Sequence, residues 1–176
     1  AEGLKPRPIT RDLDWGVPIP VPGWESKRIY VWFEAVIGYL SAAIEWAHVA
    51  SQDEAWLEWW KNPSARQFYF IGKDNIFFHT SWWPAQLMGV GEQFFEFFAP
   101  GSPASILTLP YDVPANQFMN LEGQKISGSR SWAVWCLDAL SRYDPDALRY
   151  YLTINMPEFK DSDWDWGEFV TRNNNE

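Results

Sequence analysis

Apolar and polar residues along this chain follow first the period of a strand and then the period of a helix. Arg28 to Phe33 is a β-branched and aromatic run of strand length. In the next segment, Ala35 to about Ala50, apolar residues recur at helical spacing, at Ile37, Leu40, Ile44 and Ala47. The pattern therefore predicts a strand followed by a helix.

The same order repeats further along the chain. Gln67 to Ile71 is a second apolar run that meets Gly72, and a helical pattern follows from about Asn75 to Met88. Ser105 to Leu109 is a third candidate strand, and Asp53 to Trp60 resembles a short helix. Strands that alternate with helices predict an α/β fold in which a parallel sheet carries helices on its faces, here half of a doubly wound fold.

From Pro110 the pattern changes. A short strand pair is expected around Gln117 to Leu121, followed by a polar loop from Glu122 to Arg130. Three helices are then predicted, at Ser131 to Leu140, Pro145 to Ile154 and Trp166 to Asn173. The proline-rich opening, as far as about Gly23, suits an extended surface connection. We therefore divide the chain into residues 1–109 and a mainly helical region of residues 110–176.

Composition narrows the class of protein. With 47% apolar and 18% aromatic residues, the 176-residue chain can bury a substantial core. A net charge of -9 argues against broad attraction to a polyanion, although a local basic patch can still bind one. The single cysteine, Cys136, excludes an internal disulfide and a thiolate zinc cluster within the chain. No run has the roughly 18 apolar residues of a membrane helix. We expect a soluble, cytoplasmic protein and interpret both ends as excision points.

One segment has the features of a nucleotide site. Gly72 and Asp74 stand where a strand ends and a helix begins, which is where open α/β sheets bind nucleotides. Gly72 permits close approach of the backbone, Asp74 can hold ribose hydroxyls, and His79 can face the same crevice. The alternative is that Asp74 only caps the helix and His79 is a core histidine.

A second segment, Gly123 to Arg130, combines glycines, serines and two cations before a predicted helix. Such a loop can bring positive charge and hydrogen-bond donors onto a polyphosphate, but the same residues also make an ordinary solvated turn. The many tryptophans suggest a carbohydrate-binding aromatic platform as a rival, yet that class of module expects short alternating strands rather than strands alternating with helices.

Read in order, four segments resemble the methionyl-tRNA synthetase family of class I synthetases. They are Arg11 to Pro20, Tyr30 to Tyr39 (Tyr-Val-Trp-Phe-Glu-Ala-Val-Ile-Gly-Tyr), Gly72 to His79, and the loop Lys125-Ile126-Ser127-Gly128-Ser129, which corresponds to the KMSKS signature. The helices after that loop are also similar. The resemblance implies that residues 1–109 are the second half of a Rossmann-like catalytic domain and that 110–176 is a stem-contact region.

The resemblance also implies residue roles. The pocket for the methionine side chain would be lined by Trp32, Ala35, Val36, Tyr39, Asn75 and His79, with Tyr39 and His79 near the sulfur. Gly72 and Asp74 would hold the ribose of ATP, and Ile126 would lie near adenine. Lys125, Ser127 and Ser129 would act catalytically by stabilising the triphosphate, with Lys125 also counted in the ATP site. The implied partners are methionine, ATP with Mg²⁺ and tRNA(Met); no zinc or other protein-bound metal site is expected.

Two departures from the family pattern bear on the chemistry. Gly128 stands where the signature has its second lysine, which implies weaker or rearranged stabilisation of the triphosphate. The HIGH signature of the family does not occur, so we expect half an active site that forms no adenylate alone.

Three alternatives stay open: a leucyl-, valyl- or isoleucyl-type fragment, a noncatalytic interaction module, and a fragment that self-associates. Against the first, a branched aliphatic substrate would leave a tyrosine hydroxyl and an imidazole unpaired in its pocket.

Overall fold

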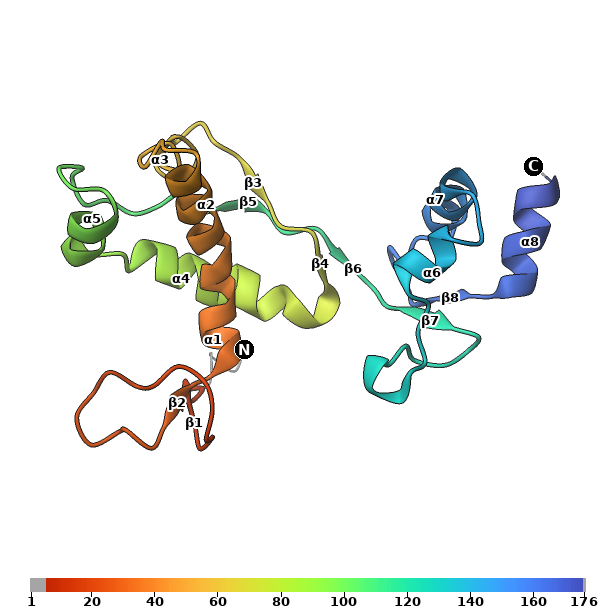
Figure 1. Cartoon of the computed structure of the whole chain (residues 1–176), viewed down its shortest axis with the longest axis horizontal. Coiled ribbons are helices and arrows are strands. Elements are labelled where there is room, and N and C mark those ends of the chain that lie inside the picture. The colour runs from red at the N-terminus through yellow and green to blue at the C-terminus, as the bar shows by residue number, and fades with distance from the viewer. Residues whose placement is uncertain (1–5, 176) are drawn as a thin grey trace, which may run out of the picture. The chain divides into compact units, whose positions relative to one another are not determined.

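The computed structural model describes residues 6–175 of the chain, as two compact units. The first unit runs up to Tyr69 and includes Asn75–Val113, and the second holds Phe70–Asp74 and the chain from Pro114 onward. The elements of both units are labelled in Figure 1. Each unit combines helices with short two-stranded ladders, three of the four ladders being parallel. The described chain is thus a mixed α/β protein.

The first unit opens with a short hairpin-like pair and then becomes helical. Strands β1 (Thr10–Arg11) and β2 (Arg28–Ile29) pair antiparallel. The helical run that follows consists of α1 (Val31–Glu34), η1 (Ala35–Ile37) and α2 (Gly38–Val49). The prediction of a strand to Phe33 is therefore wrong beyond Ile29. Aromatic packing decides this, because Trp32 stacks on Phe78 and Phe33 packs on Trp82, both on a neighbouring helix.

A second helical run follows a short parallel strand. After α3 (Leu57–Trp60) and β3 (Gln67–Phe68), the chain forms a π-helical turn, η3 (Phe78–Trp82), continued by α4 (Trp83–Met88). Together, η3 and α4 confirm a helix in the predicted 75–88 range. Two elements follow, α5 (Glu92–Phe98), which the sequence pattern did not indicate, and β5 (Pro110–Asp112).

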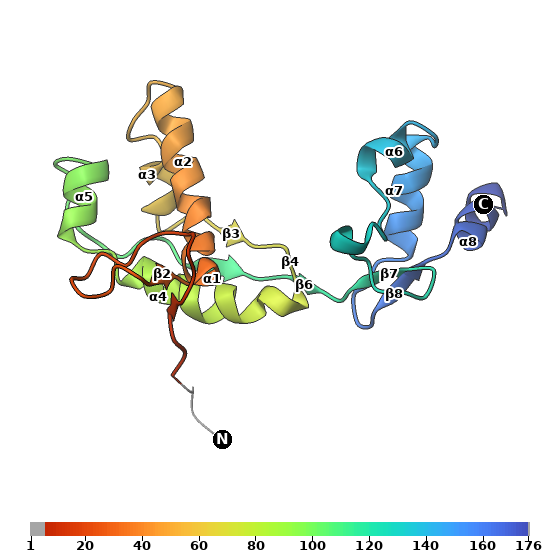
Figure 2. The same cartoon turned by 60° about the horizontal axis from the view of Figure 1, so that its bottom comes forward.

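The strand that pairs with β3 lies later than expected. β5 is parallel to β3, with Gln67 opposite Pro110. Figure 2 shows the helices and strands from a second side. The predicted strand at 105–109 is wrong, because backbone groups there bond to helix ends. The amide of Leu107 donates to the carbonyl of Leu87 (3.2 Å), and the amide of Thr108 donates to the carbonyl of Trp60 (2.7 Å).

Large aromatic side chains form the core of the first unit. Trp56, Trp83, Leu87 and Phe95 are fully buried, and Trp60 packs edge-on against Trp83. Rings of this size each bury some 150–250 Å². Trp56, Trp60 and Trp83 are thus core residues, whereas Trp15, Trp24, Trp32, Trp46 and Trp59 are exposed.

The second unit joins two parallel ladders to three helices. β4 (Ile71–Gly72) pairs with β6 (Ala115–Asn116), and β7 (Met119–Leu121) pairs with β8 (Ser162–Trp164). Of the strand pair expected around Gln117 to Leu121, a strand is confirmed as β7, but the pairing is wrong because β7 pairs with β8. The amide of Gln117, between β6 and β7, donates to the carbonyl of Pro157 (2.7 Å).

The helices of the second unit are α6 (Cys136–Leu140), α7 (Pro145–Ile154) and α8 (Trp166–Asn175), preceded by the 3-10 turn η4 (Gly128–Arg130) and, at the start of the unit, by η2 (Lys73–Asn75). The bounds of α7 match the prediction. Its first residue is proline, and the Asp144 carboxylate accepts a bond from the amide of Asp146 (2.8 Å), which is a standard helix start.

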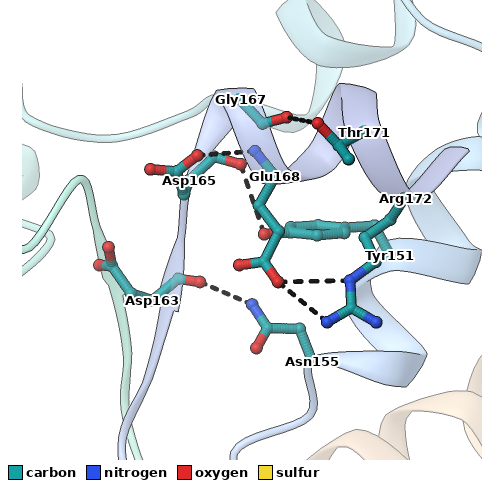
Figure 3. Close-up of polar contacts among 8 residues, drawn as sticks. All are labelled: Tyr151, Asn155, Asp163, Asp165, Gly167, Glu168, Thr171 and Arg172. Carbon is teal, nitrogen blue, oxygen red and sulfur yellow. Dashed lines mark hydrogen bonds and ion pairs between the residues drawn. The ribbon is translucent and has the colours of Figure 1, made fainter. Parts of the chain in front are cut away.

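One hydrophobic cluster holds β7, β8, α6, α7 and α8 together. Its buried members are Leu121, Ala139, Leu148, Tyr151, Trp164 and Phe169. Polar contacts surround this core, as Figure 3 shows: the Tyr151 hydroxyl donates to the carbonyl of Asp165 (3.3 Å), and Arg172 pairs with Glu168 (3.1 Å). Among the helices of residues 6–175, none is long and apolar enough to cross a membrane.

Candidate functional site

The first candidate site lies in the first unit and centres on a tyrosine and a histidine. Tyr39 is on α2, and His79 is on the π-helical turn η3, forty residues away. The Tyr39 hydroxyl lies 2.8 Å from His79 Nε2, and His79 Nδ1 lies 2.9 Å from the carbonyl oxygen of Asn75. His79 is only 4% exposed, whereas Tyr39 is 45% exposed. The buried His79 ring is therefore held by the Asn75 carbonyl, and the Tyr39 side chain is partly exposed to solvent.

The partners of the His79 ring determine its tautomer. A carbonyl oxygen only accepts, so Nδ1 must carry a hydrogen and donate to Asn75. In the neutral ring Nε2 is then an acceptor, and Tyr39 donates its hydroxyl hydrogen to it. Both groups are thereby satisfied by each other. His79 is therefore a buried histidine with both ring nitrogens satisfied, and its role in a binding site stays a prediction.

A second layer of aromatic groups supports this pair. The Tyr69 ring lies against Tyr39 (5.1 Å between centroids) and His79 (5.8 Å). Its hydroxyl accepts from Trp83 Nε1 (2.9 Å) and donates to Gln67 (2.6 Å). Burial raises the pKa of Tyr69, and the bond from Trp83 partly opposes that rise. Tyr69 and Trp83 were not identified as site residues, because only the fold brings them behind Tyr39.

The other residues implied for this site lie on the same helical segments. Val36 is buried at 3% exposure, and Ala35 is exposed on the turn beside it. Trp32 is half-exposed, with its ring stacked on Phe78 at 5.3 Å. Asn75 supplies the carbonyl that holds His79. The first unit therefore contains the whole implied methionine set, on α1 to α2 and on the 75–79 segment.

The second candidate site lies in the second unit and begins at the turn after β4. Gly72 pairs with Asn116 in the parallel ladder, and Asp74 follows in η2. A Cβ atom on Gly72 would lie 2.9 Å from Asp74 Oδ1. A side chain at position 72 would therefore displace the Asp74 carboxylate, so glycine is what allows that carboxylate to lie over the end of the strand.

Lys73, between these two residues, is bound on several sides. Its Nζ donates to Asp161 Oδ1 (2.6 Å) and to Gln117 Oε1 (2.9 Å), and it lies over the Phe118 ring at 4.4 Å. The amide of Phe118 also donates to Asp161 Oδ1 (3.0 Å). The bond from Lys73, followed by that amide, lowers the pKa of Asp161. No sequence pattern pointed to Asp161, which is 88 residues from Lys73.

The loop from Gly123 to Arg130, the Lys125 loop, follows β7 directly. Two backbone hydrogen bonds join Ser127 to Trp132, and the Trp132 indole donates to the carbonyl of Leu121 (3.1 Å). Within this loop, the hydroxyl oxygens of Ser127 and Ser129 lie 3.2 Å apart. These contacts hold the serines of the loop near each other.

The cations of this loop lie on its surface. Lys125 and Arg130 are exposed, and Arg130 Nη2 donates to the carbonyl of Lys125 at 3.4 Å. Lys125 Nζ lies 5.7 Å from the centre of the Phe118 ring, and no ion pair of Lys125 occurs among residues 6–175. Ile126 is 40% exposed. The arrangement offers two cations and two hydroxyls to an anion.

The base of the loop is held by a carboxylate. Asp163, on β8, accepts a bond from the amide of Gly123 with both oxygens (2.9 and 2.8 Å). Glu122 and Gly123 have positive φ values, 49° and 71°, which make a tight turn between β7 and the loop. Among the described residues no group of three or more His, Cys, Asp or Glu side chains could hold a metal ion.

Comparison with known proteins gives one consistent result. A family model described as tRNA synthetases class I (M) matches residues 1–176. A methionine–tRNA ligase of Thermomicrobium roseum is 58% identical to this chain over 99% of its length, and one of Chloroflexus aggregans is 57% identical over 98%. The chain spans 28% and 30% of those two relatives.

Solved structures agree with the sequence relatives. A Mycobacterium tuberculosis methionyl-tRNA synthetase bound by methionyl-adenylate matches 98% of the chain with a TM-score of 0.66 and 26% identity, over 29% of its own length. The apo form of a synthetase from the same organism matches 95% of the chain with a TM-score of 0.57 and 26% identity, over 27% of its length.

Proposed function

The chain belongs to the class I tRNA synthetases (M), and from this membership we propose that it contributes to the ATP-dependent activation of methionine and its transfer to tRNA(Met). The observation that carries the proposal is the grouping of the implied residues. The methionine set gathers in the first unit around Tyr39 and His79, and the ATP set gathers in the second unit around Gly72 and Lys125.

The methionine site would recognise a thioether through aromatic surface. Sulfur is a weak acceptor that favours the edges of aromatic rings. Because Tyr39 already donates its hydroxyl hydrogen to His79, the sulfur would meet the edge of the Tyr39 ring rather than accept a hydrogen bond from it. Val36 and Trp32 would supply apolar wall, and Ala35 would leave room for the unbranched chain.

This geometry changes the reason for selectivity over branched substrates. Leucine, valine or isoleucine would not leave Tyr39 and His79 unpaired, because these two groups satisfy each other. Selectivity would instead come from the fit of a long unbranched side chain and from the contact between sulfur and ring. The names of the relatives, methionine–tRNA ligases, support methionine over the three branched alternatives.

The ATP site would consist of the turn after β4 and the Lys125 loop. Asp74 would accept bonds from the ribose hydroxyls, with Gly72 giving the nucleotide access to the backbone. Ile126 would contact adenine. Lys125, Ser127 and Ser129 would stabilise the triphosphate, and Mg²⁺ would enter with the nucleotide, since this ion is commonly held by substrate phosphates and water.

The chemistry would be a displacement at phosphorus. The methionine carboxylate attacks the α-phosphate of ATP, giving methionyl-adenylate and pyrophosphate, and the terminal adenosine of tRNA then displaces AMP. Negative charge builds on phosphate oxygens, so catalysis would depend on positioning and electrostatic stabilisation. Gly128 removes one lysine of the signature, a loss of about 10²- to 10³-fold by analogy with one preorganised donor, unless Lys125 or Arg130 replaces it.

The wider setting follows from the same family. Residues 1–109 would form the second half of a Rossmann-like catalytic domain, and 110–176 a region that contacts the tRNA acceptor stem. A cytoplasmic location suits tRNA aminoacylation, and an exposed free thiol at Cys136 suits a reducing compartment.

Calorimetric titration tests the two sites separately. The chain is titrated with methionine and, in a second series, with ATP and Mg²⁺. We expect His79→Ala to abolish methionine binding and His48→Ala, at the only other histidine, to leave it unchanged, because His48 is an exposed partner of Asp53.

For the ATP series, Asp74→Ala should weaken binding, and the matched control is Asp146→Ala, an exposed carboxylate on α7. If neither ligand binds, or if each control behaves like its site variant, the assigned residues are not the site.

A further inference from the structure

Two carboxylates beside β8 have no role in the proposed chemistry. Asp163 is on β8 and Asp161 directly precedes that strand, and side chains two residues apart along an extended strand project from one face. Trp164, on the opposite face, is buried in the aromatic core of the second unit. Both carboxylates contact the stretch of chain from Phe118 to Gly123 that lies alongside β8.

Asp161 holds the turn that carries Gly72 and Asp74. Its Oδ1 accepts from Lys73 Nζ at 2.6 Å and from the amide of Phe118 at 3.0 Å. The second bond fixes the carboxylate to the backbone, and the first then fixes the lysine between the two implied ribose-binding residues. A charge-assisted bond of this kind is short and directional, so it sets the orientation of the turn.

Asp163 holds the Lys125 loop in the same manner. Its two carboxylate oxygens both accept from the amide of Gly123, two residues before the lysine. Its own carbonyl oxygen accepts from Asn155 Nδ2 (2.6 Å) at the end of α7, and Figure 3 shows its carboxylate directed away from Asn155. One residue thus links the loop to the helical core.

The two anchored segments meet at one aromatic ring. Lys73 Nζ lies 4.4 Å and Lys125 Nζ lies 5.7 Å from the centre of the Phe118 ring. Of these two cations, Lys73 is paired with Asp161, whereas Lys125 has no ion pair among residues 6–175. An incoming polyphosphate would therefore meet Lys125 as the cation that is not yet neutralised.

We propose that Asp161 and Asp163 are positioning residues that hold the Gly72–Asp74 turn and the Lys125 loop in the arrangement that binds ATP. This inference rests on the proposed function and adds two residues to it. Neither carboxylate need touch the nucleotide, because each acts through a neighbour, Lys73 in one case and the Gly123 amide in the other.

The test compares the affinities of the two ligands in the same variants. Asp161→Asn and Asp163→Asn are titrated with ATP and Mg²⁺ and with methionine, and Asp146→Asn on α7 is the control. We expect ATP to bind about three- to tenfold more weakly in both site variants, since each loses the ionic character of one anchoring bond. Methionine affinity should equal that of the unaltered chain, because its residues lie in the first unit.

Hydrogen exchange adds a readout that needs no ligand. The amides of Phe118 and Gly123 should exchange faster in Asp161→Asn and Asp163→Asn respectively, and adding Lys73→Met to Asp161→Asn should weaken ATP binding little further. Unchanged ATP affinity in both variants overturns the inference, as does a parallel loss of methionine affinity, which indicates general unfolding. Failure of the unaltered chain to bind ATP instead refutes the proposed function, and the positioning role with it.

Discussion

Removing the hydroxyl of Tyr39 should lower the unfolding free energy of the first unit, because that hydroxyl is the hydrogen-bond partner of His79 Nε2. In Tyr39→Phe, His79 Nε2 loses its partner at 2.8 Å while Nδ1 stays bound to the carbonyl of Asn75. The ring cannot turn over to use Nε2 elsewhere without giving up the Asn75 bond. A buried acceptor without a partner costs about 1–3 kcal/mol, and His79 is 4% exposed.

This cost converts into a measurable change in melting temperature. For a chain of this size, 1 kcal/mol corresponds to about 2–4 °C, so Tyr39→Phe should melt roughly 2–12 °C lower. Denaturant unfolding followed by circular dichroism gives the free energy directly. The matched control is Tyr111→Phe, because the Tyr111 ring packs on Phe68 and under Arg66 but its hydroxyl makes no hydrogen bond within residues 6–175.

The difference in stability between Tyr39→Phe and Tyr111→Phe tests the hydrogen bond between Tyr39 and His79. If Tyr39→Phe is as stable as Tyr111→Phe, the Tyr39 hydroxyl does not satisfy a buried ring nitrogen, and the deduced tautomer of His79 is wrong. If the loss appears and hydrogen exchange at residues 75–79 accelerates with it, the bond is what holds that helical turn in place.

Three further predictions concern other parts of the chain. Gly72→Ala should weaken ATP binding several-fold with little change in melting, because a Cβ 2.9 Å from Asp74 Oδ1 displaces a flexible carboxylate rather than backbone; calorimetry and melting together check this. Burial raises the pKa of Tyr69 above its unfolded value of about 10, so the stability it contributes is complete below that pH and is lost as pH rises through the folded pKa; alkaline unfolding curves measure it. Asp144→Ala should cost about 0.5–2 kcal/mol of unfolding free energy, and Asp144→Asn much less, because only alanine fails to accept from the amide of Asp146 at the start of α7.

Local chemistry predicted the helices more accurately than the strands. Pro145 after Asp144 gave the start of α7, and the spacing at Ile37, Leu40, Ile44 and Ala47 gave α2, because caps and periodicity act within a few residues. The strands are only two or three residues long, and each pairs with a segment far away in the chain. Such pairing leaves little trace in the apolar pattern.

Candidate site residues could be chosen from the sequence where their own side chains carry the proposed chemistry. The segments with Tyr39, His79, Gly72, Asp74 and Lys125 were identified from residue types and from their order along the chain. Whether these residues act as assigned stays a prediction for the experiments above.

The residues that hold the Gly72–Asp74 turn and the Lys125 loop could not have been identified from the sequence. Asp161, Asp163 and Phe118 look like ordinary polar or apolar residues until the β7–β8 pairing brings them to the turn and the loop.

By itself, the sequence determined the family, the main helices and the residues available for the chemistry, because propensity, capping and motif order act over short distances. Only the tertiary structure decided which groups are already paired. His79 and Tyr39 satisfy each other and Lys73 is neutralised by Asp161, whereas Lys125 and Arg130 have no ion pair within residues 6–175 and can meet an anion. These pairings join residues about 40 and 88 positions apart, and close packing of distant segments, not local preference, brings such residues within bonding distance.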